Sequence, residues 1–531
     1  MSLLSSRLIA TALVLAACAV VLFVGLGSYP LWDPDEGRHA EIAREVLGAT
    51  DWHGWVTPRL NDEPYREKPI FFYWAVAVAY AAVGVNELGA RLVSALAAFA
   101  TVTAVFAWSL PRWGPRPAAL AALVLLTGIE FAGLGRFANL DMLLTLFLTA
   151  GVLAVERWGT TKRTTWIVAA ATAAAFGMLT KGLVAPLLIG GVGLVHLAVQ
   201  HRLDLLRSRA LVLALAVFVA LAAPWHLLAA AIDPAYLREL YLEGHLGRFV
   251  GTARAFHHEP FWFYVPILLA GFFPWSALLP ATIAATRTDD DDARLCLVWA
   301  GIVFLFFSAS VSKLGTYILP CFPPLALLTG RALDSLLSPD ALPGRAHRLA
   351  GWGLWLVVVV LLVLPIVLVV LARWSWDGAL TGTSLMALGL LPIGGLLGRL
   401  LWRDRIPQAV AMLAASAVLV LVGFYRFAAP PVSLLASTAP LAAVIRERAP
   451  DDVPVVAYAI RAPSLLFYLR RPIIHLARWR PLRKLVAGHP LVLVVTSLKH
   501  RATIAEAGVT APWQTGGRRE LWGSQPPPDS P

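Results

Sequence analysis

Long apolar runs dominate the chain up to about residue 428, and most are long enough to cross a membrane. A bilayer core of about 30 Å requires ~17 to 25 mostly apolar residues in a helix. The first run follows Arg7 as a signal peptide would, but no clear small-x-small cleavage site precedes Tyr29, which favours a retained helix. The pattern predicts an α-helical polytopic membrane protein with about 13 transmembrane helices, at residues 8–27, 90–110, 117–134, 140–156, 165–180, 182–199, 210–231, 262–283, 293–310, 317–335, 350–372, 383–401 and 407–427.

Basic residues gather in five of the six even-to-odd connections between these runs, and the sixth has four consecutive Asp residues flanked by Arg287 and Arg294. The basic residues of the five connections are Arg112, Arg116, Arg157, Lys162, Arg163, Arg202, Arg207, Arg209, Arg345, Arg348, Arg403 and Arg405. Short loops rich in Arg and Lys stay in the cytoplasm. The sequence therefore predicts a cytoplasmic amino terminus, with the segments 28–89 and 232–261 and everything after about residue 428 on the outer side.

The chain changes character after residue 428. Apolar runs shorten to strand length at 453–458 and 491–496, and a helix-like stretch at 438–448 precedes the first of them. Short strands alternating with helices predict a small α/β domain over residues 428–531, ending in a Pro-rich disordered tail. We expect residues 1–427 to form the transmembrane domain, with juxtamembrane helices in its outer loop 28–89.

The composition excludes an ordinary soluble protein. The 531 residues are 58% hydrophobic and only 14% charged, with a mean hydropathy of +0.70. Soluble domains carry roughly 25% charged residues. The net charge is +12, but the basic loops follow the orientation rule for membrane proteins, so nucleic acid is discounted as a partner.

The outer loop 28–89 opens with a pattern typical of a helix start. Asp33 is a capping residue type, Pro34 fits the first helical position, and Glu36 follows three residues after the predicted cap. On this helix Asp35 and Arg38 share a face, because residues three apart are neighbours. The alternative is a capped surface helix without a further role.

A second charged segment lies about thirty residues further on. Glu67 and Lys68 stand just before an aromatic, apolar stretch that reaches Trp74. Lys and Arg bind phosphate at headgroup level, and apolar side chains suit a polyisoprenyl chain below it. A carboxylate beside such a site is suited to take a proton from an incoming hydroxyl group.

Other charged groups lie at the outer ends of the predicted spans. Asp141, Lys181 and Lys313 with Tyr317 belong to three different outer connections. Ionisable groups at such depth are costly and are functional candidates by default. The alternative for the lysines is that they reach the interface and anchor helix ends.

Histidines gather in the predicted outer segment 232–261. This segment contains His245, Arg248, His257, His258 and Glu259. Single histidines in such a loop are usually surface residues, although His and Glu together can hold a divalent metal.

At these residues the chain resembles the polyprenyl-phosphate-dependent glycosyltransferases of the C-type (GT-C) superfamily. It is most similar to the 4-amino-4-deoxy-L-arabinose lipid A transferases, which are related to protein mannosyltransferases. The stretches that carry the resemblance are 33–45, Asp51-Trp52, 65–69, Tyr73-Trp74, 84–91, 136–142, 179–182, 313–324 and 463–468.

The resemblance implies roles for individual residues. Asp35 takes the catalytic acidic position, and Asp141 is the second acidic residue of the superfamily. Arg38, Tyr65, Lys68 and Tyr317 would hold the lipid phosphate. Together with the charges noted above, the predicted substrate-binding set is Glu36, Arg38, Tyr65, Lys68, Asp141, Lys181, Lys313 and Tyr317.

A metal site is also implied. In such proteins a residue at the position of Glu67 binds a divalent ion with a histidine of the later outer loop, for which His245 is the candidate here. A Gly-rich nucleotide loop is not apparent, which favours a lipid-linked donor and no nucleotide cofactor.

The leading hypothesis is transfer of 4-amino-4-deoxy-L-arabinose from undecaprenyl phosphate to lipid A, by an inverting single displacement at the periplasmic side of a bacterial inner membrane. One alternative keeps the donor class but moves another sugar to a protein, lipid or envelope glycan. A lipid flippase or transporter is a different class, and it would show paired broken helices in two related halves. A non-catalytic lipid-binding protein is the third alternative.

Overall fold

The computed structural model describes residues 3–251, 258–338, 344–374, 387–515 and 518–527. Contacts along the chain divide it into two compact units. The first unit comprises residues 1–26, 66–72 and 91–426, and the second comprises 27–65, 73–90 and 427–531. The second unit therefore combines the first long outer loop with the carboxy-terminal part of the chain.

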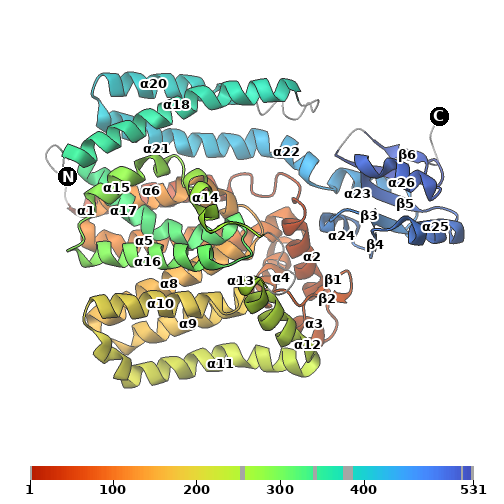
Figure 1. The fold of residues 1–531 in the computed structure, drawn as a ribbon, viewed down its shortest axis with the longest axis horizontal. Helices are drawn as coiled ribbons and strands as arrows, with labels where there is room; N and C mark the ends of the chain where they lie inside the picture. The colour runs from red at the N-terminus through yellow and green to blue at the C-terminus, as the bar shows by residue number, and fades with distance from the viewer. Residues whose placement is uncertain (1–2, 252–257, 339–343, 375–386, 516–517, 528–531) are drawn as a thin grey trace. The chain divides into compact units, whose positions relative to one another are not determined.

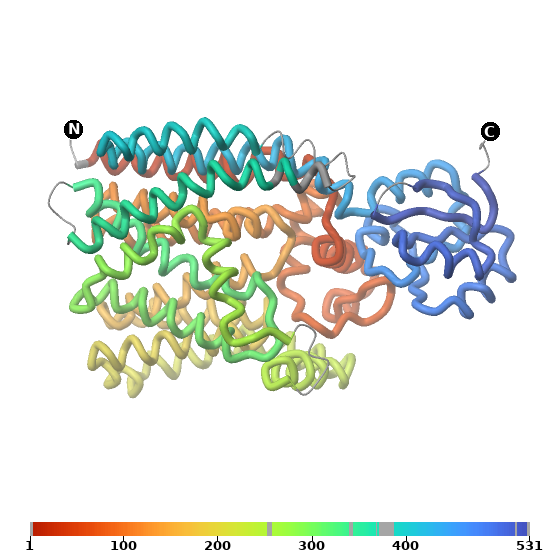
Figure 2. The backbone as a smooth tube through the Cα atoms, turned by 45° about the horizontal axis from the view of Figure 1, so that its top comes forward, coloured from red at the N-terminus to blue at the C-terminus, as the bar shows by residue number. Residues whose placement is uncertain are grey.

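Helices build the first unit. Long helices run side by side in it, with α9 packed against α8, α10 and α11 (Figures 1 and 2). Its main helices are α1 (Leu3–Cys18), α5 (Glu87–Trp113), α6 (Pro115–Thr127), α7 (Ile129–Gly135), α8 (Leu140–Thr161), α9 (Thr164–Lys181), α10 (Val184–Val199), α11 (Arg209–Ile232), α14 (Tyr264–Gly271), α15 (Leu279–Ala285), α16 (Asp291–Ala309), α17 (Phe322–Leu336), α18 (Gly344–Trp374), α20 (Leu390–Trp402) and α21 (Ile406–Gly423). Shorter turns join them, among them the π-helical segment η3 (Arg238–Gly247).

The prediction of a mostly helical polytopic membrane protein is confirmed. Within the described residues, six helical stretches are long and apolar enough to cross a membrane. They are Leu4–Phe23, Glu87–Trp113, Arg209–Ile232, Asp291–Ala309, Gly344–Val367 and Ile406–Ala436. The total is eight if two bent helix pairs each count as one span, so the predicted thirteen are found only in part.

Breaks in two predicted spans account for part of the difference. The span expected at 117–134 bends by 70° between α6 and α7, and the one expected at 262–283 bends by 108° before Trp275. Gly128 has an extended backbone between α6 and α7, which ends the first helix. Both segments are therefore broken rather than continuous helices.

The other predicted spans fold as helices that are shorter, less apolar or more charged than those six. The ranges 140–156, 165–180 and 182–199 correspond to α8, α9 and α10. Most of 317–335 corresponds to α17, and 383–401 to α20, with residues 383–386 outside the described residues.

The second unit contains helices from both parts of the chain. The outer loop provides α2 (Asp35–Gly48), α3 (Trp52–Val56), a two-stranded hairpin of β1 (Arg59–Leu60) and β2 (Glu63–Pro64), and most of α4 (Phe71–Val83). The carboxy-terminal part provides α22 (Ala429–Ala436), α23 (Ala439–Arg448), α24 (Pro463–Leu469), α25 (Trp479–Gly488) and α26 (Arg501–Glu506).

A five-stranded mixed sheet organises the carboxy-terminal domain, as the sequence predicts in outline. Its order is β4 (Ile474–Leu476), β3 (Val455–Tyr458), β5 (Leu493–Ser497), β7 (Arg519–Gly523) and β6 (Ala511–Gln514). β3 pairs in parallel with β4 and β5, whereas β7 is antiparallel to β5 and β6. The predicted strands and helix at 453–458, 491–496 and 438–448 correspond to β3, β5 and α23. Residues 528–531 of the predicted tail lie outside the described residues.

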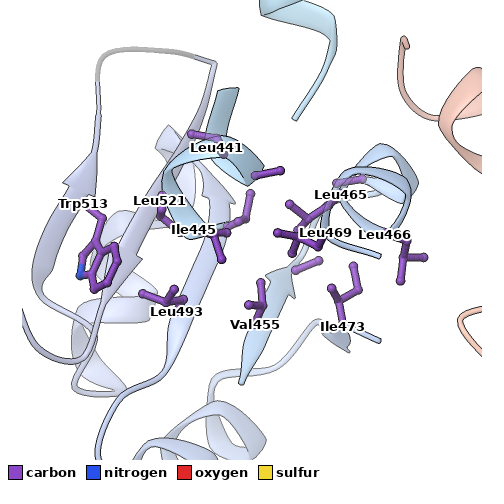
Figure 3. Close-up of a cluster of buried hydrophobic side chains, with 14 residues drawn as sticks. Leu441, Ile445, Val455, Leu465, Leu466, Leu469, Ile473, Leu493, Trp513 and Leu521 are labelled. Atoms are coloured by element: carbon purple, nitrogen blue, oxygen red, sulfur yellow. The ribbon is translucent and has the colours of Figure 1, made fainter. Parts of the chain in front are cut away.

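Helices cover both faces of this sheet, and β3 and the first half of β5 are apolar on both sides. Val455 and Leu493 join a cluster with Ile445 of α23 and Leu465 of α24 (Figure 3). Val456, the next residue along β3, joins the cluster on the other face, to which α25 and α26 also contribute. Successive side chains of a strand point to opposite faces, and parallel strands buried on both faces read as continuous apolar runs.

The helix expected after Asp33 is present, but its predicted cap is wrong. α2 begins at Asp35, and Pro34 occupies the capping position without a side-chain hydrogen bond. The Asp33 carboxylate instead accepts hydrogen bonds from Ser464, 431 residues further along the chain. Glu36 does reach back as the pattern predicts, because its Oε2 accepts a hydrogen bond from the backbone N–H of Trp32 at 3.0 Å.

Glu45 on α2 is a carboxylate whose surroundings favour its neutral form. Its Oε1 accepts a hydrogen bond of 2.7 Å from the backbone N–H of Asn61, while its Oε2 is buried and has no hydrogen-bond partner among the described residues. Burial, with Glu41 nearby, raises the pKa of Glu45 from 4.5 to about 7. The folded chain therefore retains a proton that the unfolded chain loses, and the associated stability is present below pH 4.5 and is lost as the pH rises through 7.

Replacing Glu45 with Gln should remove this pH dependence, because the amide mimics the protonated carboxyl group. At about 1.4 kcal/mol per pH unit, E45Q should be more stable than the wild type at pH 8 by up to about 3 kcal/mol, with no such gain at pH 4.5. Thermal unfolding of the purified protein between pH 4.5 and 8 checks this, with the exposed Glu63→Gln as control. Equal pH slopes for the wild type and E45Q would contradict the prediction.

Candidate active site

A cavity of about 260 Å³ lies in the first unit, between the end of α9, the segment η3 and the end of α16. Four of the residues that the sequence singles out line it together, namely Lys68, Lys181, His245 and Tyr317. Most of the remaining wall is apolar. The other lining residues are Leu183, Val184, Leu187, Tyr241, Gly244, Leu246, Arg248, Phe249, Phe306, Phe307, Ser310 and Ser312.

A buried ion pair joins two helices beside this cavity. Lys181 is the last residue of α9, and its Nζ binds the carboxylate of Asp141 in the first turn of α8. The two side chains are only 8% and 12% exposed. Asn139 caps α8, because its Oδ1 accepts a hydrogen bond of 2.8 Å from the backbone N–H of Asp141. The cap fixes the backbone that presents the carboxylate.

The ammonium group of Lys181 also contacts an aromatic ring. Its Nζ lies 3.9 Å from the ring centroid of Tyr317, a geometry in which the ring face attracts a cation. Phe307 lies next to Tyr317, with 5.7 Å between the ring centroids. Lys181 is therefore held by a carboxylate and a ring, and it lies at the edge of the apolar wall.

His245 packs directly onto the chain after Lys181. Gly182 has φ of +69°, and a Cβ atom there would lie 2.3 Å from Nε2 of His245. Burial, reinforced by Lys68, Lys181 and Arg248, lowers the pKa of His245 from 6.5 to about 3. The imidazole is therefore neutral at pH 7, and it offers one hydrogen-bond donor and one acceptor rather than a charge.

Cations outnumber carboxylates around the cavity. The hydroxyl group of Tyr236 donates a hydrogen bond of 2.7 Å to the backbone carbonyl of Lys68, which fixes the segment entering α4. Arg248 pairs with Glu67 at 3.0 Å. Three basic side chains, two carboxylates and an apolar wall make a site suited to a phosphate group attached to an aliphatic chain.

The predicted metal ligands do not form a metal centre in this arrangement. Glu67 is half exposed and is bound to Arg248, and the charged neighbours that act on His245 are all cations. Among the described residues, no group of three or more His, Cys, Asp and Glu side chains is placed to hold a metal ion. Neighbouring cations disfavour a divalent ion here, and the metal site at Glu67 and His245 stays a prediction.

Lys313 lies next to this cavity but does not line it. Its Nζ donates hydrogen bonds to the backbone carbonyl groups of Glu259, at 2.8 Å, and Ser310. It lines a separate cavity of about 400 Å³ together with His258 and other residues of the segment before α14. The structure therefore does not bring Lys313 to the cavity that contains Lys181.

The acidic helix α2 belongs to the second unit. Arg38 forms an ion pair with Asp35, as their spacing predicts, and these side chains are 25% and 49% exposed. Tyr65 is buried in the same unit, edge-on to Tyr73 with 6.4 Å between the ring centroids. Glu36 is fully buried against Trp32. Asp35 is thus the more accessible member of the acidic pair.

Comparisons with known proteins identify the family. Residues 67–227 match the family described as dolichyl-phosphate-mannose-protein mannosyltransferase. An undecaprenyl phosphate-alpha-4-amino-4-deoxy-L-arabinose arabinosyl transferase of Pseudomonas fluorescens strain Pf-5 is 35% identical over 344 residues, which span 64% of this chain and 58% of that protein. The homologue from strain Pf0-1 is 34% identical over 438 residues, which span 81% of this chain and 77% of that one.

The chain belongs to the undecaprenyl phosphate-aminoarabinose arabinosyl transferase family. ArnT from Cupriavidus metallidurans, whose crystal structure is bound to undecaprenyl phosphate, superposes with a TM-score of 0.82 at 26% identity and covers 97% of this chain and 98% of its own. The oligosaccharyltransferase of Archaeoglobus fulgidus is 12% identical with a TM-score of 0.53, covering 94% of this chain and 70% of that one, and shares the fold alone. The resemblance seen in the sequence is thus confirmed.

Two further residues line the cavity of this arabinosyl transferase family member: the sequence places Arg248 in the same segment as His245 without a role, and it does not single out Tyr241. Arg248 and Tyr241 line the cavity from η3 and the residue after it. Tyr241 contacts His226 of α11 through its hydroxyl group. Their spacing from His245, at three and four residues, is the signal that would have placed them near it, since such residues are neighbours in a helix.

Gly182→Ala should destabilise the protein by about 2 kcal/mol or more. The methyl group would meet the ring of His245 while the backbone holds a positive φ that side chains disfavour. Gly190→Ala on α10 is the control, because a Cβ atom there meets nothing within 4 Å. The measurement is the thermal unfolding of the purified protein. Equal unfolding midpoints for the two variants would show that His245 does not pack on Gly182 as described.

Proposed function

We propose that this protein transfers 4-amino-4-deoxy-L-arabinose from undecaprenyl phosphate to lipid A. The observation that carries the proposal is the cavity in which Lys68, Lys181 and Arg248 adjoin an apolar wall. A lipid-linked sugar presents this combination, a phosphate group on a long aliphatic chain. Membership of the family supports the choice of sugar and acceptor.

We place the reaction at the periplasmic side of a bacterial inner membrane, with thirteen crossings and the carboxy-terminal domain in the periplasm. The basic connections support this orientation, because they leave Lys68, Asp141, Lys181 and His245 on the opposite side. Asp141 and Lys181 lie at helix ends that this orientation directs to the same side, and the structure joins them.

The basic residues of the cavity neutralise the leaving phosphate. As the bond between the anomeric carbon and the phosphate oxygen breaks, negative charge grows on that oxygen. Ion pairs already position Lys181 and Arg248, and a hydrogen bond fixes the backbone of Lys68, so these residues stabilise the charge with little reorganisation. Neutral His245 adds a hydrogen bond to the site, and Asp141 and Tyr317 hold Lys181 in place.

Asp35 is the residue that we assign as general base. Its carboxylate is about half exposed, so an acceptor hydroxyl group is able to reach it, and Arg38 orients it through their ion pair. The acceptor oxygen attacks the anomeric carbon, the bond to phosphate breaks with its electrons, and the hydroxyl proton passes to Asp35. This single displacement inverts the anomeric centre and releases undecaprenyl phosphate.

Replacing Asp35 with Asn should lower kcat by about 10²- to 10⁴-fold, the usual contribution of a general base. Binding of undecaprenyl phosphate should stay within about twofold, because the phosphate site is made by other residues. The assay is transfer of aminoarabinose from a synthetic donor to lipid A by the purified protein. Asp62→Asn, an exposed carboxylate of the same outer loop, serves as the control. Turnover near the wild-type rate in D35N would exclude Asp35 as the base.

Replacing Lys181 with Met should weaken binding of undecaprenyl phosphate by about 10- to 100-fold, since hydrogen bonds to charged groups contribute about 1.5–3 kcal/mol. The exposed Lys484→Met is the matched control. Binding is measured by titrating undecaprenyl phosphate into the purified protein and recording its thermal shift. Unchanged affinity in K181M would place the donor phosphate outside this cavity.

A further inference from the structure

Asp33 is a fully buried carboxylate just before the acidic helix. Its side chain is 0% exposed. Oδ1 accepts a hydrogen bond of 2.7 Å from the backbone N–H of Ser464, Oδ2 accepts one of 2.5 Å from the Ser464 hydroxyl group, and Arg519 forms an ion pair with Oδ2. A buried charge is stable only when paired and hydrogen-bonded, and here two elements of the carboxy-terminal domain, α24 and β7, provide the partners.

The hydroxyl group of Ser464 uses its full hydrogen-bonding capacity. It donates to Asp33 and accepts from the backbone N–H and the side chain of Thr438, at 3.1 and 2.6 Å. A hydroxyl group has one proton and two lone pairs. Ser464 and Thr438 are both fully buried. Asp33, Ser464 and Arg519, which we call the Asp33 clamp, thus form a complete polar network.

Contacts on either side of Asp35 also fix this segment against α24. Before it, the backbone N–H of Leu31 donates a hydrogen bond of 2.8 Å to the hydroxyl oxygen of Tyr468 on α24. After it, Gly37 lies so close to α24 that a Cβ atom would be 2.4 Å from the backbone nitrogen of Ser464. The start of α2 is therefore fixed against α24 at residues 31, 33 and 37.

We propose that the carboxy-terminal domain is part of the catalytic apparatus and that the Asp33 clamp positions the Asp35 carboxylate. Asp33, Ser464 and Arg519 are positioning residues, because they fix the segment that leads into α2. The inference rests on the proposed role of Asp35 as general base. It gives the carboxy-terminal domain a function in the chemical step that does not require it to bind substrate.

A positioning role and a merely structural role predict different results. Loss of a structural contact lowers stability and leaves the properties of the folded enzyme unchanged. Loss of positioning lowers kcat in enzyme that is still folded, because displacing a catalytic group by about 1 Å reduces the rate by up to 10²-fold. The affinity for undecaprenyl phosphate should not change, since the phosphate cavity is lined by residues of the first unit.

The test uses Ser464→Ala and Arg519→Gln in the purified full-length protein. Each should lower kcat by about 10-fold or more while binding of undecaprenyl phosphate stays within about twofold. Arg519→Gln keeps the proposal testable if S464A fails to fold, because Arg519 lies at the partly exposed edge of the clamp. Asp451→Asn is the control, since Asp451 is fully exposed and pairs with Arg471 in the same domain.

A double-mutant cycle with Asp35→Asn then separates the clamp from the base. If the clamp acts through Asp35, adding S464A or R519Q to D35N should leave the residual rate unchanged within about twofold. Wild-type kcat in folded S464A and R519Q, or a further 10-fold loss in the D35N background, would overturn the proposal. A D35N enzyme that retains full activity would instead overturn the proposed function itself.

Discussion

The ion pair between Lys181 and Asp141 is the interaction on which the donor cavity depends. Each charge alone would be costly at a helix end among apolar neighbours, and removing either would leave the other buried and unpaired. Together they join the end of α9 to the start of α8. This fixes the turn at Gly182, against which His245 packs, and sets Lys181 over the ring of Tyr317. This ion pair thus determines where the ammonium group of Lys181 lies in the cavity.

In the proposed reaction the two units have different roles, which follow from their composition. The first unit has the apolar helices, so it can offer a lipid chain a wall and a phosphate group a few well-held cations. The second unit has the polar helix α2 and a sheet domain with its own core (Figure 3). An acidic residue such as Asp35 needs a firm support outside the apolar region, and Asp33 gives α2 that support by bonding to Ser464.

Local patterns in the sequence predicted the elements well and the long-range contacts less well. The apolar runs identified the helical membrane protein, and strand-length runs identified β3 and β5. Asp33 illustrates the limit. Its position before a helix is typical of a cap, yet Ser464 and Arg519, more than 430 residues away, offer a buried carboxylate stronger partners. No local pattern contains that information.

The same holds for the site: the sequence identifies candidate residues but does not show which of them meet in the fold. The cost of intramembrane charge singled out Asp141 and Lys181 from the sequence, and the structure joins them. Lys313 met the same criterion but hydrogen-bonds to nearby backbone carbonyl groups and lines another cavity. The sequence places Arg248 in the same segment as His245 but does not show that it lines the cavity, because an arginine in a polar loop gives no sign of what it faces. Apolarity alone also does not reveal bends, such as those at Gly128 and before Trp275.

Mass spectrometry of lipid A from cells with and without this protein tests the central claim most directly. The account predicts a mass increment equal to one aminoarabinose in the presence of the protein and its loss on deletion. It also predicts that the wild-type gene restores the increment and that a gene encoding Asp35→Asn does not. Lipid A that is identical in all four strains would contradict the assigned acceptor, and a restored increment with Asp35→Asn would contradict the assigned base.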